Sequence, residues 1–155
     1  MITRAFATTL LMLASAAWAA EPLELQTQYE KAATITGDGT ARIVVYSDRA
    51  GTAQAQAWGD ALGESSCPVV AAANLSGVPE LAQAMVAEGF EGEDSVALDW
   101  GGRVAQRFGF TPEVANVYLL DAQGRRTMHM IGAPSSQKLD RLNSAGRARC
   151  ADGGQ

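Results

Sequence analysis

Ile43-Val44-Val45-Tyr46-Ser47 is a continuous apolar and β-branched run, and Asp48-Arg49-Ala50-Gly51 follows it directly. Such a run, bounded by glycines, is typical of a strand that is buried on both faces. From Thr52 the apolar residues recur with the period of a helix, on a stripe formed by Ala53, Ala57, Trp58, Ala61 and Leu62. This strand and helix decide the fold, because together they begin a β-α-β unit.

The same order follows once more along the chain. Residues 68–73, Pro-Val-Val-Ala-Ala-Ala, predict a second buried strand. Pro79 then stands at the expected first position of a helix that ends at Gly89. The predicted inward stripe of this helix consists of Leu81, Ala82, Met85 and Val86. Two parallel strands joined by a helix almost always cross over right-handed.

The second half of the chain predicts a short helix followed by a hairpin. Residues 95–98 read as a short extended piece, and Asp99 is placed to cap a helix that carries Val104 and Phe108. Residues 115–121 and 125–131 predict two antiparallel strands, joined by the turn sequence Asp121-Ala122-Gln123-Gly124.

A last helix completes the predicted order. Ser135 is placed to cap it, with Leu139 and Leu142 facing inward. The predicted core is therefore β-α-β-α-β-β-α. That order indicates the α/β class, with three layers and helices on both faces of a mixed sheet.

Residues 1–19 have the pattern of a secretory signal peptide. A basic start with Arg4 precedes an apolar stretch, and Ala17-Trp18-Ala19 supplies the small residues of a cleavage site. A membrane anchor is the alternative, but the apolar run is shorter than the roughly 20 residues that a spanning helix needs. We therefore expect cleavage after Ala19, export to the periplasm and a mature protein without a membrane span.

The mature chain has the length of one domain. We divide it into an N-terminal segment at 20–41 that leads into the domain, a domain at 42–146 and a polar C-terminal tail at 147–155. The whole chain has 12 basic and 17 acidic side chains, a net charge of −5, and loss of Arg4 with the signal peptide makes it −6. An acidic chain without a basic stripe does not predict a nucleic-acid partner.

Several stretches resemble the thioredoxin-like superfamily. One is Arg42–Ser47 with the helix after it; another is Val117–Arg125 followed by Gly132, which is similar to the strand, turn and strand of peroxiredoxin and TlpA-type proteins. A closer resemblance is to the small exported proteins of the YtfJ family, which have an Ala-Gly-Arg-Thr-like stretch where Arg49-Ala50-Gly51-Thr52 stands here. The resemblance covers residues 42–143 and implies a thioredoxin-like fold more than a function.

This chain lacks the thiol site of the redox members of that superfamily. Thiol–disulfide exchange needs a reactive thiolate at a helix N-terminus, normally with a second cysteine one turn later. The residues at that place, Asp48 to Thr52, include no cysteine. The proline that redox members carry before the first hairpin strand corresponds to Ala115, and Pro112 stands three residues too early. We therefore expect neither oxidoreductase nor peroxidase activity at this place.

A binding role at the same turn is what the resemblance implies. Thioredoxin-like proteins recognise partners there, so Asp48, Arg49, Gly51 and Thr52 are candidate contacts for an unknown periplasmic protein or small ligand. The alternative is that Asp48 and Thr52 only cap the helix and its turn. Trp100 is expected near the same edge, either exposed or as partly buried cover for the sheet. No cofactor is implied.

Cys67 and Cys150 are the only cysteines of the chain. In an oxidising compartment we expect them to form a disulfide. In the topology that the resemblance implies, the first and last helices both run toward the lower end of the sheet on one face, where the two thiols can meet. The alternative function is a thiol-dependent oxidoreductase or peroxidase that uses Cys67 at an atypical site. A third interpretation is a structural envelope protein without a ligand.

Met128-His129-Met130 has side chains of the kind that bind copper. In a strand, however, the two methionines point to one face and the histidine to the other. The three side chains therefore cannot bind one ion. We predict two core methionines and no metal site.

Overall fold

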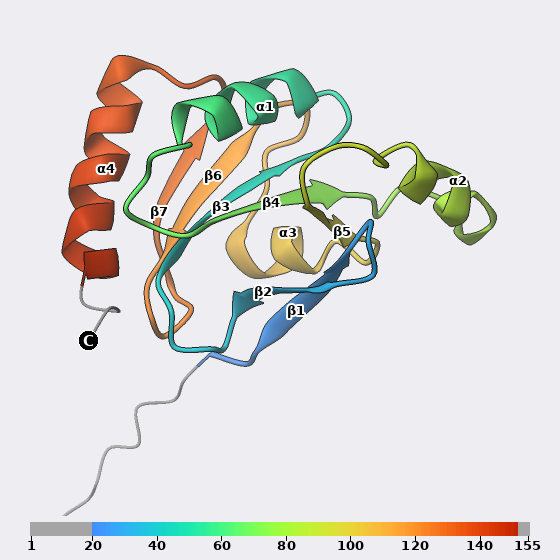
Figure 1. The fold of residues 1–155 in the computed structure, drawn as a ribbon, viewed down its shortest axis with the longest axis horizontal. Helices are drawn as coiled ribbons and strands as arrows, with labels where there is room; N and C mark the ends of the chain where they lie inside the picture. Colours follow the sequence, from blue (N-terminus) through green and yellow to red (C-terminus); the bar gives the residue numbers. More distant parts are fainter. Residues whose placement is uncertain (1–19, 152–155) are drawn as a thin grey trace, which may run out of the picture.

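The computed structural model describes residues 20–151, so the predicted signal peptide and the end of the predicted tail, 152–155, lie outside the described residues. The described chain forms one mixed sheet with helices on both faces (Figure 1). Its strands are β1 (Leu23–Thr27), β2 (Ala32–Thr36), β3 (Arg42–Ser47), β4 (Val69–Asn74), β5 (Val96–Asp99), β6 (Asn116–Leu120) and β7 (Arg126–Ile131). Its helices are α1 (Thr52–Ala61), the 3₁₀ helix η1 (Glu80–Ala82), α2 (Gln83–Glu88), α3 (Arg103–Phe108) and α4 (Ser136–Cys150).

The seven strands lie in the order β2-β1-β5-β4-β3-β6-β7 across the sheet. β3, β4 and β5 are parallel to one another, and the other neighbouring pairs are antiparallel. Every residue of β3 is buried, because the strand lies between β4 and β6 and is covered on both faces. The predicted mixed sheet and the predicted β6–β7 hairpin are therefore confirmed.

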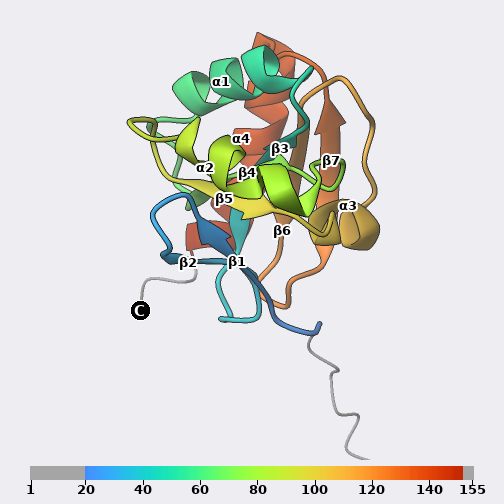
Figure 2. The same ribbon diagram turned by 90° about the vertical axis from the view of Figure 1, so that its right-hand side faces the viewer.

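Two apolar clusters lie on opposite faces of the sheet, with α1 and α3 on either side (Figure 2). On one face, α1 and α4 contribute Trp58, Leu62 and Leu142 to a cluster with sheet residues that include Val45. Of the predicted α1 stripe, Ala53 and Ala61 are exposed, so the inward face is narrower than predicted. On the other face, α3 packs on the sheet through buried apolar side chains, Val104 and Phe108.

The predicted N-terminal segment at 20–41 contains a hairpin that the sequence analysis did not predict. β1 pairs with β2 and, through Gln26 and Thr27, with β5, so the hairpin forms one edge of the sheet. β1 alternates buried and exposed residues, as a strand with one buried face does. The alternation of Leu23 and Leu25 was the available signal, but five residues are too few to distinguish it from a loop.

The stretch predicted as a polar C-terminal tail, 147–155, begins within a helix. α4 continues to Cys150, so residues 147–150 are helical. Ala145 and Cys150 pack against the apolar cluster that lies between the sheet and the helices α1 and α4. This packing holds the last turn of α4 on the domain.

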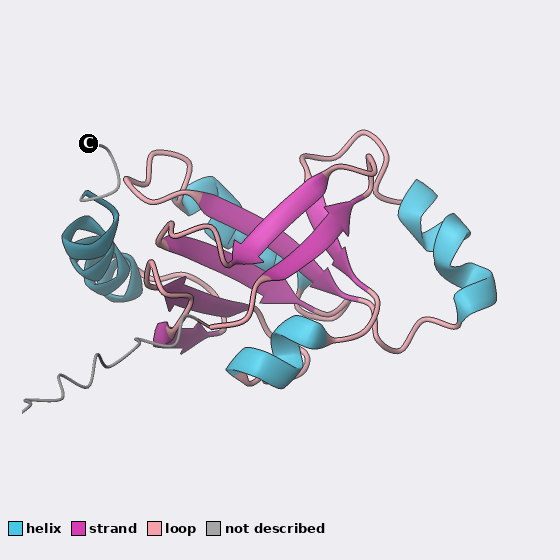
Figure 3. Cartoon of the chain, turned by 90° about the horizontal axis from the view of Figure 1, so that it is seen from below, coloured by secondary structure: helices cyan, strands magenta, loops and turns pink. Residues whose placement is uncertain are grey.

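The predicted inward stripe of the second helix is also wrong. Leu81 and Met85 are exposed, and neither η1 nor α2 has a buried residue. Both lie beyond the ends of the strands rather than over the sheet (Figure 3). Along residues 20–151, no helix is long and apolar enough to cross a membrane.

Candidate functional site

The carboxyl ends of β3, β4 and β5 lie together because these three strands are parallel, and we call this end of the sheet its carboxyl edge. Asp48 follows β3 and Trp100 follows β5, so both predicted contacts lie at this edge. β4 lies between those two strands, however, so the structure does not bring Trp100 beside the Asp48 turn. The indole is half-buried, as the cover interpretation expects.

Asp48 uses both of its carboxylate oxygens to bind backbone. Oδ1 accepts a hydrogen bond from the Gly51 amide at 3.0 Å, and Oδ2 accepts one from the Glu113 amide at 2.9 Å. The hydroxyl of Thr52 donates to the Asp48 carbonyl at 3.3 Å. The turn and capping interpretation of these two residues therefore has specific contacts. Asp48 also joins the start of α1 to the loop before β6.

The loop before β6 lies directly on the start of α1. A Cβ atom added to Gly51 would lie 2.6 Å from the carbonyl carbon of Val114, so only glycine allows this approach. Gln54 of α1 accepts a hydrogen bond from the Ala115 amide at 3.0 Å through Oε1. Ala115 stands where the resemblance described above places the proline of redox members. Its amide is therefore already bound within the protein.

Arg49 remains available at this edge. Its side chain is exposed, as is Thr52, and within residues 20–151 it takes part in no ion pair or side-chain hydrogen bond. The Asp48 contacts hold the backbone of the turn that carries it. The edge thus presents a guanidinium group on an ordered turn, which suits an acidic group of a partner.

Asn116 binds the 111–115 loop from inside the domain. It is fully buried; its amide nitrogen donates to the carbonyls of Thr111 and Val114, and its amide oxygen accepts from the Thr111 amide. Asn116 was not among the predicted site residues, although a lone amide in an apolar strand was a signal. Gln54, which binds the loop from the other side, had no comparable signal.

His129 makes the fourth contact of the Asn116 side chain, with Nε2 lying 2.9 Å from the amide oxygen. Its ring stacks on Tyr118 with centroids 4.7 Å apart, while Met128 and Met130 contact the opposite cluster. The predicted separation of His129 from the two methionines is therefore confirmed. No group of three histidine, cysteine, aspartate or glutamate side chains able to hold a metal occurs in the described part of the chain.

His129 should titrate below the ordinary histidine pKa of 6.5, because burial and then the nearby Arg126 guanidinium both lower its pKa. The neutral ring donates from Nε2 and leaves Nδ1 facing Arg126 at 3.5 Å. Since the folded pKa is depressed, the stability from the neutral ring is complete above pH 6.5 and falls as the pH drops toward the folded pKa. NMR titration of the single histidine measures this, and Arg126→Gln should raise the pKa. A wild-type pKa of 6.5 or higher would contradict the prediction.

Asp99 binds the first two amides of α3, as the predicted cap would, although the N-cap position itself is Gly102. Its carboxylate accepts hydrogen bonds from the amides of Arg103 at 2.8 Å and Val104 at 2.9 Å. It also accepts one from the hydroxyl of Tyr46 at 2.8 Å, and this buried contact links β3 to β5. Burial, together with the nearby Asp99 carboxylate, raises the pKa of Tyr46, so the phenol remains a donor.

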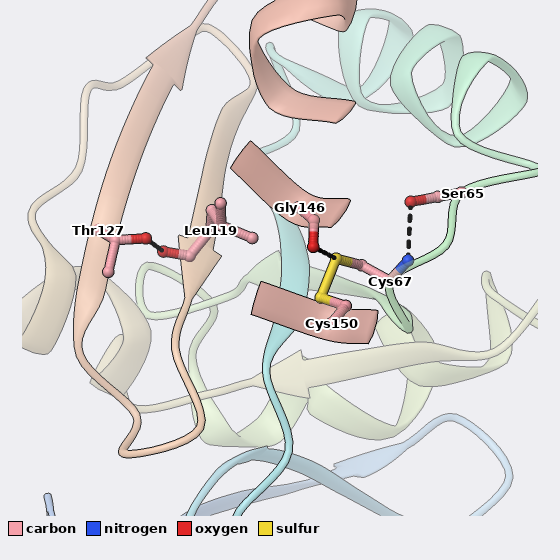
Figure 4. The surroundings of a disulfide bond; sticks show 6 residues. All are labelled: Ser65, Cys67, Leu119, Thr127, Gly146 and Cys150. Carbon is pink, nitrogen blue, oxygen red and sulfur yellow. Dashed lines mark hydrogen bonds between the residues drawn. A yellow bond between two sulfur atoms is a disulfide. The ribbon is translucent and has the colours of Figure 1, made fainter. Parts of the chain in front are cut away.

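The two cysteines form the predicted disulfide, Cys67–Cys150 (Figure 4). It joins the segment before β4 to the last turn of α4, at the edge of the sheet opposite Asp48. A Cβ atom on Gly146 would lie 3.0 Å from the Cys67 sulfur, so the glycine lets α4 approach. Both cysteines of the chain are in this bond, so the alternative that uses Cys67 has no free thiol in this state.

Two open cavities were found away from the Asp48 turn. One, of about 300 Å³, lies between Pro22 and the α3 residues Arg103 and Arg107. The other, of about 350 Å³, lies between the end of α1 and α4 and includes Glu64 and Arg147. Neither includes a residue of the predicted binding turn.

Comparison with known proteins identifies the fold. No protein-family model matches the sequence, and no curated protein matches it. Among solved structures, the chain is similar to the exposed lipoprotein thioredoxin Etrx1 of Streptococcus pneumoniae, with 13% identity and a TM-score of 0.64 over 80% of this chain and 98% of the other. It is also similar to StoA of Bacillus subtilis, with 16% identity and a TM-score of 0.57 over 83% and 97%.

A third similar structure is the N-terminal domain of PilB from Neisseria gonorrhoeae, with 12% identity and a TM-score of 0.60 over 83% of this chain and 91% of that domain. Identities this low show the fold and not the activity. The chain therefore has the α/β thioredoxin-like fold, built on a mixed seven-stranded sheet.

Proposed function

We propose that this chain is a periplasmic protein of the YtfJ type that carries out no thiol chemistry and binds another protein through Arg49. The observation that carries the proposal is that, at the carboxyl edge, some side chains bind the neighbouring loop while Arg49 stays exposed. Asp48, Gly51 and Gln54 hold the loop before β6 by hydrogen bonds and close packing. Arg49 is left exposed on a turn that these contacts order.

A protein partner fits this edge better than a small ligand does. Small-molecule sites are usually concave and enclose most of the ligand, and the two cavities described above lie away from the Asp48 turn. An exposed arginine on an ordered turn instead suits a carboxylate at a protein surface, because the planar guanidinium binds it through two parallel hydrogen bonds.

The absence of thiol chemistry is tested by two enzyme assays. Insulin reduction and peroxide consumption should both be at background for the wild-type protein and for Cys67→Ser. Activity that disappears in Cys67→Ser would support the alternative of an atypical thiol enzyme and overturn this part of the proposal. Export is tested separately by cell fractionation and by sequencing the mature N-terminus, which should begin at Ala20 if cleavage follows Ala19.

The binding role predicts a partner that depends on Arg49. In a pull-down from envelope extract, Arg49→Ala should lose a protein that the wild type retains, because the substitution removes the free guanidinium and leaves the Asp48 contacts intact. Arg141→Ala, at an exposed position on α4, is the matched control and should retain it. If neither variant differs from wild type, or if no protein is retained at all, a structural envelope role without a ligand becomes the better explanation.

A further inference from the structure

Leu81 and Met85 expose apolar surface at the end of the molecule. Leu81 is fully exposed and Met85 is 69% exposed, the two highest values among the large apolar side chains that are exposed in the described chain. They are four residues apart in the continuous η1–α2 segment, so they lie on the same side of it. η1 and α2 extend away from the sheet, as Figures 1 and 3 show. Paired apolar side chains on a projecting element are a feature of protein docking surfaces.

The base of this segment is held in place by the β1–β2 turn. The side-chain amide of Gln28 donates to the carbonyls of Phe90 and Asp94, and its oxygen accepts from the Val96 amide at 2.8 Å. The hydroxyl of Tyr29 donates to the Glu93 carbonyl at 2.7 Å. η1 and α2 therefore project from a loop that is hydrogen-bonded to the sheet.

The same segment is strongly acidic. Residues 79–94 contain no lysine or arginine, and their acidic side chains are all exposed and unpaired within residues 20–151: Glu80, Glu88, Glu91, Glu93 and Asp94. A partner that covers Leu81 and Met85 therefore docks on a segment that carries five negative charges and no positive charge. Complementarity requires basic side chains around an apolar centre.

We propose that η1 and α2 form a docking surface for a partner protein whose contacting segment is a cationic amphipathic helix. Such a helix places apolar side chains on Leu81 and Met85 and lysine or arginine beside the surrounding carboxylates. The surface repels an anionic membrane, because membranes of that kind attract basic and not acidic segments. A second copy of this chain is a poorer occupant, because α4, which carries the exposed Arg141, Arg147 and Arg149, exposes no large apolar side chain.

The docking surface does not depend on the proposed function at Arg49.

The probe is a fluorescent synthetic helix with leucine on one face and lysine on the other, and its binding is followed by fluorescence anisotropy. The wild-type protein should bind this peptide but not a peptide of the same composition in scrambled order, nor one with glutamate in place of lysine. Arg49→Ala should bind it as the wild type does, which separates the two proposals.

Two sets of variants test the chemistry of the surface. Leu81→Ser with Met85→Ser should raise the Kd by about tenfold or more, since central apolar contacts dominate such interfaces. A triple variant, Glu88→Gln, Glu91→Gln and Glu93→Gln, should also weaken binding and reduce its salt dependence. The matched control is Asp60→Asn, Glu64→Gln and Asp140→Asn, which changes the net charge equally at exposed positions of α1, the loop between α1 and β4, and α4.

Several results would overturn the proposal. One is an absence of peptide binding; another is equal weakening by both charge variants, which means a general attraction to an acidic protein. Self-association of the wild type in analytical ultracentrifugation that disappears in the Leu81 and Met85 variant would identify a second copy as the occupant. Binding to anionic phospholipid vesicles that is lost in the same variant would identify a membrane.

Discussion

Replacement of Cys67 and Cys150 together by alanine should lower the free energy of unfolding by about 4 to 5 kcal/mol, because the disulfide closes a loop with a sequence separation of 83 residues. In the chain-entropy account, this loop restricts the unfolded chain more than the folded one. Urea unfolding of the oxidised wild type and the double variant measures the difference. The disulfide lies at the edge opposite Asp48, so Arg49-dependent binding by the folded double variant should be unchanged.

The reduced wild-type protein is the control for this measurement. Cys67 is 4% exposed, so alanine also removes a buried sulfur, whereas reduction breaks the link and retains both sulfur atoms. The two forms should unfold at similar urea concentrations. Detection of two free thiols in the denatured, non-reduced protein would show that the bond does not form and would remove the basis of the prediction.

Asp99→Ala should lower the free energy of unfolding by about 3 to 5 kcal/mol, since each buried donor left without a partner costs about 1 to 3 kcal/mol. Three donors lose their acceptor: the Tyr46 hydroxyl and the amides of Arg103 and Val104. The start of α3 should also become less protected against amide hydrogen exchange. Urea unfolding together with exchange at Val104 tests both parts of the prediction.

Tyr46→Phe separates the contributions of Asp99. Alone, it should cost about 1 kcal/mol, the net value of a typical hydrogen bond. In the Asp99→Ala background the same substitution should cost less or be stabilising, because it removes a donor that already has no partner. Two results would mean that water replaces the carboxylate. One is an equal effect of Tyr46→Phe in both backgrounds, and the other is a loss of less than about 1 kcal/mol in the free energy of unfolding for Asp99→Ala.

The centre of the sheet was predictable from the sequence because β3, β4 and β6 are largely apolar runs and turn residues mark the hairpin between β6 and β7. β3, β4 and the β6–β7 hairpin all lie where the pattern predicts them. The outer hairpin was not predicted, since β1 and β2 are short and mix polar with apolar residues. The apolar period of residues 81–86 indicated a helix correctly but could not show whether anything lies against its apolar side.

The position of the turn after β3 was predictable from the sequence, but the contacts of its residues were not. The turn after β3 was expected to matter, and capping by Asp48 and Thr52 was an explicit alternative. The hydrogen bond from the Glu113 amide to Asp48 joins residues 65 positions apart, and no local pattern indicates such a pair. Gln54 was missed for the same reason, because its partner Ala115 lies 61 positions away.

A cysteine engineered at residue 51, to give the helix a reactive sulfur, would bring its Cβ to 2.6 Å from the carbonyl carbon of Val114. Rotation of the new side chain cannot relieve this overlap, because the atoms that collide are Cβ and main chain. The 113–115 loop would have to withdraw, at the cost of its hydrogen bonds to Asp48 and Gln54. A dithiol site that uses residue 51 therefore requires redesign of the 113–115 loop before the cysteine is introduced.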